Sequence, residues 1–404
     1  MAGVGRRFVV ALVMTILAAP ATASAYRAAT GYQAGDYATG FPVASASGWG
    51  PIGVAFDASD NLYVASAANG HIYRFQPGGG TASTSTRLTG APIPGDIKGL
   101  AISRDGRMYL ARYEAGDVVE LDPATGAVRR TVATGIRCAL GLAVDPLSGD
   151  LFVSQSSCGM AIWRISGPTG DAPATSVYSG PLPDADGLTF APDGTLYAAS
   201  AGQVVKIDGT DKPTAGASRS LTSVPHADGV AIGAADGADP FVVVNGTDGN
   251  VTRVDFSASP AQKTPVLSEG TRGDFVAVDS RGCLYVTQAS SVVRVTPTGR
   301  ACDLAPSTAG ALPVPAIDID RISPRGSCAK RLSKVVLRVR QRGRVRLRWV
   351  KVYVGAKRVQ TVKNKRVTSR ITVRRIPRRD FTVKLVARTS KGKTLKKRVR
   401  YKNC

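Results

Sequence analysis

The sequence predicts an all-β protein, a six-bladed β-propeller followed by a small immunoglobulin-like β-sandwich. Two observations carry this prediction. A pair of short strands joined by a tight turn recurs six times between residues 53 and 286. The charge then changes abruptly, because residues 318–404 contain 31 Lys and Arg but only 3 Asp. We therefore expect a signal peptide over 1–25, a propeller over 26–317 and a basic sandwich over 318–404.

The repeated unit is an apolar strand with small residues, a turn with Asp, Gly or Asn, and a second strand such as LYV. The clearest copies are GVAFDASDNLY from Gly53 and GLTFAPDGTLY from Gly187. The six copies begin at Gly53, Gly99, Gly141, Gly187, Gly229 and Phe275. Their spacing of 42 or 46 residues suits one four-stranded propeller blade. Small residues are expected in the innermost strands because bulky side chains would clash around the axis.

A propeller must close its ring, and two segments compete for the outermost strand of the sixth blade. One is Asp36–Phe41, near the mature N-terminus, and the other is Arg300–Leu304. The first contains the string ATG just before the next blade, as other outer strands do. We therefore favour closure by the N-terminal segment.

The first 25 residues have the pattern of a secretory signal peptide. Arg6 and Arg7 precede a short apolar run, Phe8–Ala19, and small residues follow it. The run is too short for a membrane span, which needs roughly 20 residues. We therefore expect cleavage before Tyr26 and no transmembrane segment in the mature chain. The protein would be secreted, extracellular or associated with the cell surface.

Six cysteines in an exported chain suggest three disulfides. Strand direction predicts their pairing, because neighbouring strands alternate and their turns lie alternately on two faces of a propeller. Two cysteines fall on the upper face of the third blade and two on the lower face of the sixth. The remaining two bracket the basic domain. The predicted pairs are Cys138–Cys158, Cys283–Cys302 and Cys328–Cys404.

Apolar and basic residues alternate in the C-terminal region, for example in VVLRVR from Val335 and FTVKLV from Phe381. Alternation of period two indicates half-buried antiparallel strands, and about six or seven such strands suit an immunoglobulin-like sandwich. Its outward face would be cationic and could bind an anionic cell-surface polymer. The other interpretation is a solvated spacer. The few aromatic residues are scattered, so specific nucleic-acid recognition is not expected.

The repeats resemble the six-bladed calcium-dependent phosphotriesterase superfamily, which includes gluconolactonase/senescence-marker-like, streptogramin-lyase-like and NHL-repeat propellers. The resemblance covers about residues 36–305 and rests on the strings from Gly53 and Gly187. It implies a divalent metal, calcium or magnesium, at the mouth of the central channel. In lactonase-like members its ligands are an acid near the first blade and Asn or Asp just before the blade-opening glycines.

The corresponding positions of this chain are Ile52, Lys98, Leu140, Asp186, Asp228 and Asp274. Three consecutive blades thus offer carboxylates, and converging carboxylates need a cation or a raised pKa. The resemblance makes Asp186, Asp228 and Asp274 the predicted metal ligands. The alternative is that they cap backbone amides at strand starts. The family's first-blade acid has no counterpart here, since Trp49 and Ile52 occupy its place.

The same region supplies candidates for catalysis and ligand binding. In a hydrolase Asp228 would act as the base for a metal-activated water. His226 would be a general acid or base beside it, which is the nearest counterpart of the lyase-like members' histidine. Lys98 and Arg112 point toward the same mouth and could hold an anionic small-molecule ligand. We expect His71 to be structural.

Two functions from different classes remain open. The first is a gluconolactonase- or streptogramin-lyase-like protein that binds a small lactone-type molecule at the channel mouth or cleaves it with a metal ion. The second is a non-catalytic extracellular binding or scaffold propeller, anchored to a polyanionic surface by its basic domain. The aspartates favour the first function, and the absent first-blade acid favours the second.

Overall fold

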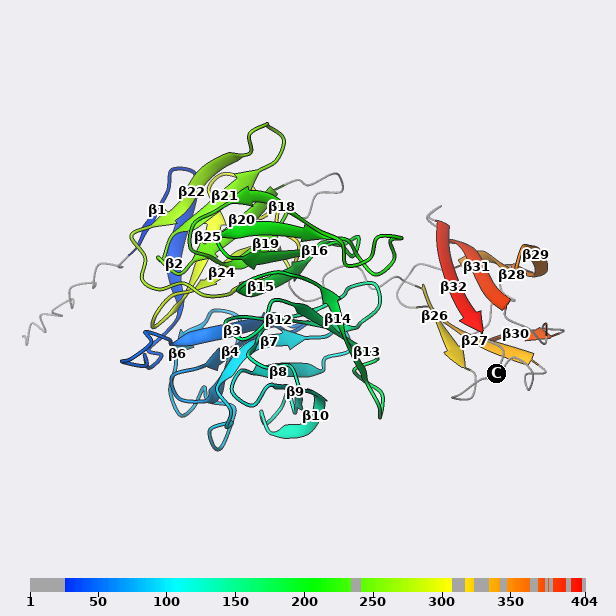
Figure 1. Cartoon of the computed structure of the whole chain (residues 1–404), viewed down its shortest axis with the longest axis horizontal. Helices are drawn as coiled ribbons and strands as arrows, with labels where there is room; N and C mark the ends of the chain where they lie inside the picture. Colours follow the sequence, from blue (N-terminus) through cyan, green and yellow to red (C-terminus); the bar gives the residue numbers. More distant parts are fainter. Residues whose placement is uncertain are drawn as a thin grey trace, which may run out of the picture.

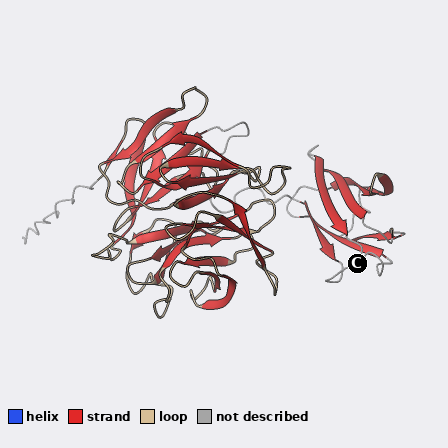
Figure 2. Ribbon diagram, viewed as in Figure 1, coloured by secondary structure: helices blue, strands red, loops and turns tan. Residues whose placement is uncertain are grey.

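The computed structural model describes residues 26–233, 241–306, 317–322, 334–341, 347–363, 370–374, 377, 381–389 and 394–401. Every regular element in this part of the chain is a β-strand (Figures 1 and 2), which confirms the predicted all-β class. The described residues contain no helix with the length and hydropathy of a membrane span. The predicted signal peptide and the predicted Cys328–Cys404 pair lie outside the described residues.

The described residues between 26 and 306 form six sheets, and each sheet contains one sequence repeat. The first holds β3 (Pro51–Phe56), β4 (Leu62–Ser66) and β5 (His71–Phe75). The second holds β7 (Ile97–Ile102), β8 (Met108–Arg112), β9 (Asp117–Leu121) and β10 (Val128–Thr134). The third holds β11 (Ala139–Val144), β12 (Leu151–Gln155), β13 (Ile162–Ser166) and β14 (Ala174–Ser179).

Of the remaining three sheets, the fifth and sixth also include strands from near the N-terminus. The fourth holds β15 (Ala185–Phe190), β16 (Leu196–Ser200), β17 (Gln203–Ile207) and β18 (Ser218–Ser223). The fifth holds β19 (Ala227–Ile232), β20 (Phe241–Gly246), β21 (Val251–Asp255), β22 (Gln262–Ser268) and β1 (Arg27–Ala28). The sixth holds β23 (Val276–Val278), β24 (Leu284–Thr287), β25 (Val292–Pro297), β2 (Tyr32–Thr39) and β6 (Gly80–Thr81).

Aspartate side chains hold turns between first and second strands. Asp57 follows β3, and its Oδ1 accepts hydrogen bonds from the backbone N–H groups of Ser59 (2.8 Å) and Asn61 (3.0 Å). Asp279 follows β23 and accepts in the same way from the backbone of Cys283 at 3.0 Å. Aspartate is favoured here because its short side chain can bond to the backbone a few residues later. This explains the Asp that recurs after the first strand of the repeat.

The six sheets form a ring around their first strands. The innermost strands are β3, β7, β11, β15, β19 and β23. Each of them contacts the next one along the chain, and β23 contacts β3 in turn. The first strand of every repeat therefore lines the same central channel, and the loops before these strands gather at one end of it.

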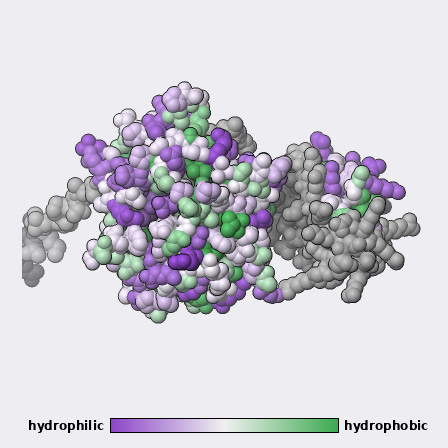
Figure 3. Space-filling view, in the orientation of Figure 1, coloured by the Kyte–Doolittle hydropathy of each residue, from purple (hydrophilic) through white to green (hydrophobic). Residues whose placement is uncertain are grey.

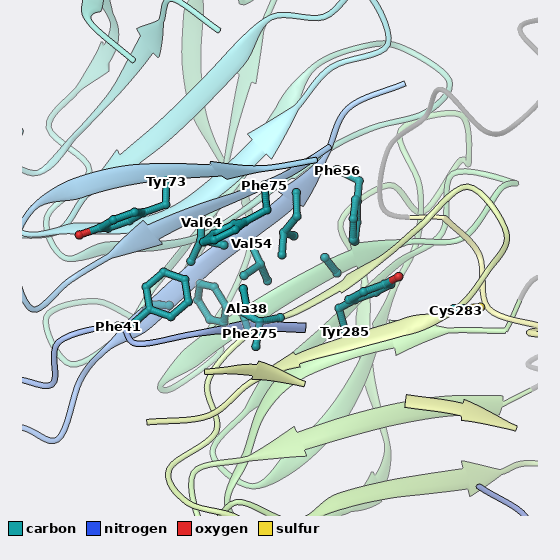
Figure 4. Packing of buried hydrophobic residues seen from close by; sticks show 14 residues of the cluster. Ala38, Phe41, Val54, Phe56, Val64, Tyr73, Phe75, Phe275, Cys283 and Tyr285 are labelled. Carbon is teal, nitrogen blue, oxygen red and sulfur yellow. The ribbon is translucent and has the colours of Figure 1, made fainter. Parts of the chain in front are cut away.

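The ring is joined between the sixth sheet and the N-terminus. As favoured from the sequence, the N-terminal strand β2 pairs antiparallel with β25, whereas Leu304 of the competing segment forms an isolated bridge to Gly233. Phe41, Phe75 and Tyr285 belong to one buried cluster that links the first and sixth sheets (Figure 4). Burial of this cluster holds the two ends of the ring together.

Two of the three predicted disulfides lie within the described residues, and both pairings are confirmed. The Cα atoms of Cys138 and Cys158 are 5.8 Å apart, and those of Cys283 and Cys302 are 4.9 Å apart. Strand direction was a sufficient guide, because each pair joins two turns on one face of a single sheet. Such bonds fit a protein that matures in an oxidising compartment.

The basic region forms two sheets, whose strands pair with none of the ring strands in the part of the chain that is described. One sheet contains β26 (Ile317–Ile322), β27 (Lys334–Gln341) and β30 (Arg370–Arg374). The other contains β29 (Lys357–Lys363), β28 (Leu347–Val354), β31 (Phe381–Thr389) and β32 (Thr394–Tyr401). Every second residue of β31 from Phe381 to Ala387 is buried. The predicted strands are confirmed, and the immunoglobulin-like class stays a prediction.

Candidate ligand site at the channel mouth

The candidate site lies where the inner strands begin. On the face of the ring region shown in Figure 3, hydrophilic and hydrophobic residues are intermixed. We call the six residues that precede the repeat starts the mouth ring. They are Ile52, Lys98, Leu140, Asp186, Asp228 and Asp274.

Close packing of neighbouring inner strands aligns the mouth-ring residues at the same level along the channel. A Cβ atom on Gly141 would lie 2.1 Å from the carbonyl oxygen of Asp186, and one on Gly187 would lie 2.6 Å from that of Asp228. The same close approach recurs at Gly53, Gly99 and Gly229 toward Lys98, Leu140 and Asp274. Glycine is required because any side chain would collide with the neighbouring backbone. The repeat thus brings the predicted aspartates to one level on three adjacent strands.

Asp228 is the second residue of β19 and is buried, with 6% of its surface exposed. Its Oδ1 atom has no hydrogen-bond partner within the chain. Burial raises the pKa of Asp228 well above its ordinary value, and the negative charges of Asp274 and Asp186 raise it further. These effects favour a neutral, protonated carboxyl group, which can donate a hydrogen bond. The role of Asp228 as a catalytic base stays a prediction.

Asp186 is less buried and has a different protonation behaviour. Burial raises the pKa of Asp186 to about 7, a hydrogen bond with the Ser156 side chain lowers it, and the charges of Asp184 and Asp274 raise it. A carboxyl group with this pKa is populated in both protonation states near neutral pH. Asp186 is therefore the mouth-ring acid best suited to exchange a proton.

Asp274 differs from the other two because it has a cationic partner. Arg272 donates from Nη2 to Oδ1 of Asp274 at 2.7 Å and from Nε to Oδ2 at 3.2 Å. Burial raises the pKa of Asp274, while the charges of Arg272 and Lys98 lower it. The charge of Arg272 also favours ionisation of Asp186 and Asp228. The guanidinium group of Arg272 thus lowers the pKa of all three acids.

Lys98 is the cation within the mouth ring, and it is fully buried. Its Nζ atom lies 2.7 Å from Oδ1 of Asp96 and 3.4 Å from the centre of the Trp49 ring. Burial lowers the pKa of Lys98, and the hydrogen bond with Asp96 opposes this effect. The guanidinium of Arg272 lies 5.9 Å from the centre of the same Trp49 ring. Trp49 therefore holds two cations at the channel mouth by cation–π attraction.

The two predicted anion-binding residues already have partners. Lys98 is paired with Asp96, and Arg112 forms a bidentate ion pair with Asp117 at 2.8 and 2.6 Å. Arg112 also donates to the carbonyl oxygen of Pro94 at 3.3 Å. An anionic ligand would have to compete with these carboxylates, so anion binding stays a prediction.

The two histidines are placed differently. His226 is exposed and has a left-handed backbone with φ of 60°, and its carbonyl oxygen accepts from Thr247 at 3.0 Å. Its proposed role in catalysis stays a prediction. His71 is buried, and its Nδ1 lies 2.8 Å from the hydroxyl oxygen of Thr89. That contact is consistent with the structural role expected for His71.

Sequence reasoning missed Trp49 as a cation holder and Arg272 as a charge partner. Trp49 precedes the first inner strand and Arg272 precedes the sixth, so the repeat alignment does not place them together. Their contact arises where the ring closes. The one local signal was the short string RGD, in which Arg272 lies two residues before Asp274.

The resemblance implies calcium or magnesium at this mouth, but the side chains are not arranged as a ready metal site. Among the described residues, no three His, Cys, Asp or Glu side chains are grouped closely enough to hold a metal ion. Both oxygens of Asp274 bind Arg272, and Trp49 occupies the first-blade position. The unpartnered Oδ1 of Asp228 supplies one free oxygen. The donor set therefore does not fit a resident divalent ion, and metal binding by Asp186, Asp228 and Asp274 stays a prediction.

Comparisons with known proteins support the fold and go no further. No protein-family model matches the chain, and no curated protein matches it. A luciferin-regenerating enzyme matches with a TM-score of 0.50 and 15% identity, over 67% of this chain and 99% of that one. A gluconolactonase from Xanthomonas campestris has 15% identity and a TM-score of 0.49, over 64% and 88%. A virginiamycin B lyase from Staphylococcus aureus has 13% identity and a TM-score of 0.43, over 67% and 99%.

The first of these matches supports a propeller-like fold over 67% of the chain. The predicted fold class is thus confirmed at the level of an all-β, propeller-like protein. At such identities the neighbours' activities do not transfer to this chain, because one fold hosts many chemistries. Function has to be argued from the mouth ring itself.

Proposed function

We propose that the ring region is a six-bladed β-propeller, one sheet to a blade, that binds a small molecule at its mouth ring. The observation that carries the proposal is the buried carboxyl of Asp228, whose Oδ1 has no partner in the chain. A buried polar atom without a hydrogen bond costs about 1–3 kcal/mol. A ligand that supplies the missing partner would recover that cost on binding.

The neighbours of Asp228 indicate the chemistry of the ligand. Arg272 already pairs with Asp274, and Lys98 pairs with Asp96, so the ligand need not be charged. Leu140, which is half-buried, adds an apolar side chain to the mouth ring. A small ring compound with several hydroxyl or carbonyl groups, such as a lactone-type molecule, suits this mixture of hydrogen-bonding and apolar groups.

A second candidate function is acid–base cleavage of such a lactone-type molecule. It is favoured by the pKa of Asp186, which is about 7 and suits proton transfer at neutral pH. In this scheme Asp186 would take a proton from a water molecule that attacks the lactone carbonyl carbon, and protonated Asp228 would donate a hydrogen bond to the carbonyl oxygen. The ester C–O bond of the ring would then break, and Asp186 would return the proton to the ring oxygen to give the hydroxy acid. His226 would act only if the exposed ring turned toward the bound molecule.

Replacing Asp228 with alanine is expected to weaken binding of a lactone-type ligand by about tenfold or more, because one hydrogen bond to a buried carboxyl is lost. The measurement is a thermal-shift screen of the full chain against a panel of lactones and their hydroxy acids, followed by calorimetric titration of any hit. Product analysis of the same mixtures shows whether a hit is bound or cleaved.

Asp193→Asn is the matched control for this screen. Asp193 follows β15 at the end opposite Asp186 and is exposed. The control should bind as tightly as the unmodified protein. Binding that is equally strong in Asp228→Ala would contradict the placement of the site at the mouth ring.

We also propose that the mature protein is exported and acts outside the cell or at its surface. The N-terminal segment with Arg6 and Arg7 supports export, and the two disulfides of the ring region fit an oxidising compartment. These observations agree with each other although they come from different parts of the chain.

We propose further that the basic region is an immunoglobulin-like sandwich that anchors the propeller to an anionic polymer. The strand orders β26-β27-β30 and β29-β28-β31-β32 match the A-B-E and C′-C-F-G sheets of such a sandwich. Lys357, Arg358 and Lys363 are exposed on β29, an edge strand. Cationic side chains on an exposed edge also discourage strand pairing between copies of the chain.

Retention of the full chain on carboxylated or phosphorylated beads is expected to fall steeply as salt rises, because each contact releases bound counterions. Changing Lys357, Arg358 and Lys363 to glutamate should lower the salt concentration of elution. The same change at Arg27, Lys212 and Lys263, which are exposed on the ring region, is the control and should have little effect. Retention independent of salt would contradict the anchoring role.

A further inference from the structure

We propose that Arg272 and Lys98 are built-in counter-cations of the mouth ring, so that this site works without a resident divalent metal ion. The proposal concerns the charge balance of the site and does not depend on which ligand the propeller binds. It rests on ion pairs, cation–π contacts and burial at one place in the ring.

The first step is the electrostatic need for a cation. The repeat brings Asp186, Asp228 and Asp274 to one level at the starts of three adjacent inner strands. Asp228 and Asp274 are nearly inaccessible to water, with 6% and 5% of their surfaces exposed. Acids buried together in this way are stable only if they stay protonated or meet positive charge.

The second step is that the chain supplies that charge. Arg272 forms a bidentate pair with Asp274, and it retains 30% side-chain exposure against 7% for its partner. It therefore reaches the acids from the solvent side of the mouth. A planar guanidinium group is well suited to form two hydrogen bonds with one carboxylate. A metal ion could bind Asp274 only by displacing the two hydrogen bonds from Arg272.

The third step is the aromatic side chain that holds both cations. Nζ of Lys98 lies 3.4 Å from the centre of the Trp49 ring, and the guanidinium of Arg272 lies 5.9 Å from it. Lys98 is fully buried, and its charge also attracts Asp274. An aromatic face stabilises a desolvated cation but offers no lone pair to a metal ion. The first-blade position, where a metal site would need an oxygen ligand, thus holds the Trp49 ring, which stabilises the side-chain cations of Lys98 and Arg272.

The experiment measures thermal unfolding of the full chain in calcium alone and in magnesium alone, each against a chelator. The unmodified protein should show no shift of the melting temperature with either ion. Arg272→Met removes the cation and keeps the aliphatic bulk. This variant should gain a stabilising shift of about 2 °C or more with one of the ions, because the freed acids then bind it.

Arg281→Met is the matched control. Arg281 pairs with Asp279, two residues apart as Arg272 and Asp274 are, although both of its nitrogens bind the same oxygen, Oδ2 of Asp279. The two pairs lie at opposite ends of the same strand, β23, and Asp279 has no acidic partner among the mouth-ring residues. Arg281→Met should lose stability without gaining a response to either ion.

Two results would overturn the proposal. One is a calcium or magnesium shift in the unmodified protein that disappears in Asp274→Asn. The other is an Arg272→Met variant that responds to the ions no more than Arg281→Met does. If Arg272→Met does not fold, two other results are required. Arg272→Lys, which keeps the charge, must show the same lack of response to calcium and magnesium as the unmodified protein. Equilibrium dialysis must show that the unmodified protein does not bind calcium. Because these readouts use metal ions alone, they are separate from the test of lactone binding.

Discussion

Asparagine in place of Asp186 should stabilise the protein at about pH 8 and leave its stability at about pH 4 nearly unchanged. The pKa of this carboxyl rises from 3.8 to about 7 on folding, chiefly because of burial. A raised pKa in the folded state contributes stability below pH 3.8, and that stability is lost as the pH rises through about 7. Above this window the ionised carboxylate opposes folding, and a neutral amide does not.

The expected gain at about pH 8 is about 2–4 kcal/mol, because one pKa unit corresponds to about 1.4 kcal/mol. Chemical denaturation at both pH values measures it directly. Asp193→Asn, at the exposed turn after β15, changes the same atoms and should give no pH-dependent gain. Equal stability of Asp186→Asn and the unmodified protein at about pH 8 would show that Asp186 is not a buried acid of the mouth ring.

Removing Trp49 should cost about 3–5 kcal/mol of stability as alanine and clearly less as phenylalanine. Two contributions add up here. Trp49 packs against the buried cluster between the first and sixth sheets, and it also covers the buried ammonium of Lys98 at 3.4 Å. Phenylalanine retains an aromatic face, whereas alanine leaves Lys98 with Asp96 as its remaining close partner at 2.7 Å.

A double-mutant cycle separates the cation contact from packing. It combines Trp49→Leu with Lys98→Met and follows urea-induced unfolding. The expected coupling energy is about 2 kcal/mol, which is typical of a desolvated cation–π contact. Coupling near zero would mean that Trp49 contributes to stability by packing alone and that its ring does not stabilise the charge of Lys98.

The sequence was sufficient to predict the features that repeat. The small residues of the first strands predicted crowding around the axis, and the structure shows it at Gly141 and Gly187, where a Cβ would lie 2.1 Å and 2.6 Å from a neighbouring carbonyl oxygen. The aspartates that precede Gly187, Gly229 and Phe275 follow from the same register. Disulfide pairing could also be predicted, because strand direction alone decides which turns share a face.

The features that the sequence could not supply depend on contacts between distant repeats. Trp49 and Arg272 meet because the first and sixth sheets share a core at the closure, which no local pattern encodes. The ion pair of Arg112 with Asp117 is local by contrast, because the two residues face each other on the neighbouring strands β8 and β9 of one sheet. His226 and Asp228 are two residues apart, yet one is exposed and the other buried, because the chain turns into β19 between them.

The central claim is that Asp186, Asp228 and Asp274 act as one coupled group within a channel mouth whose positive charge comes from the chain. Carbon-detected NMR titration of the aspartate carboxyls tests this claim most directly. The account predicts a titration midpoint of about 7 for Asp186, which should fall when Asp274 is changed to asparagine because a neighbouring negative charge is removed. A midpoint in the ordinary range of aspartate, unaffected by this substitution, would contradict it.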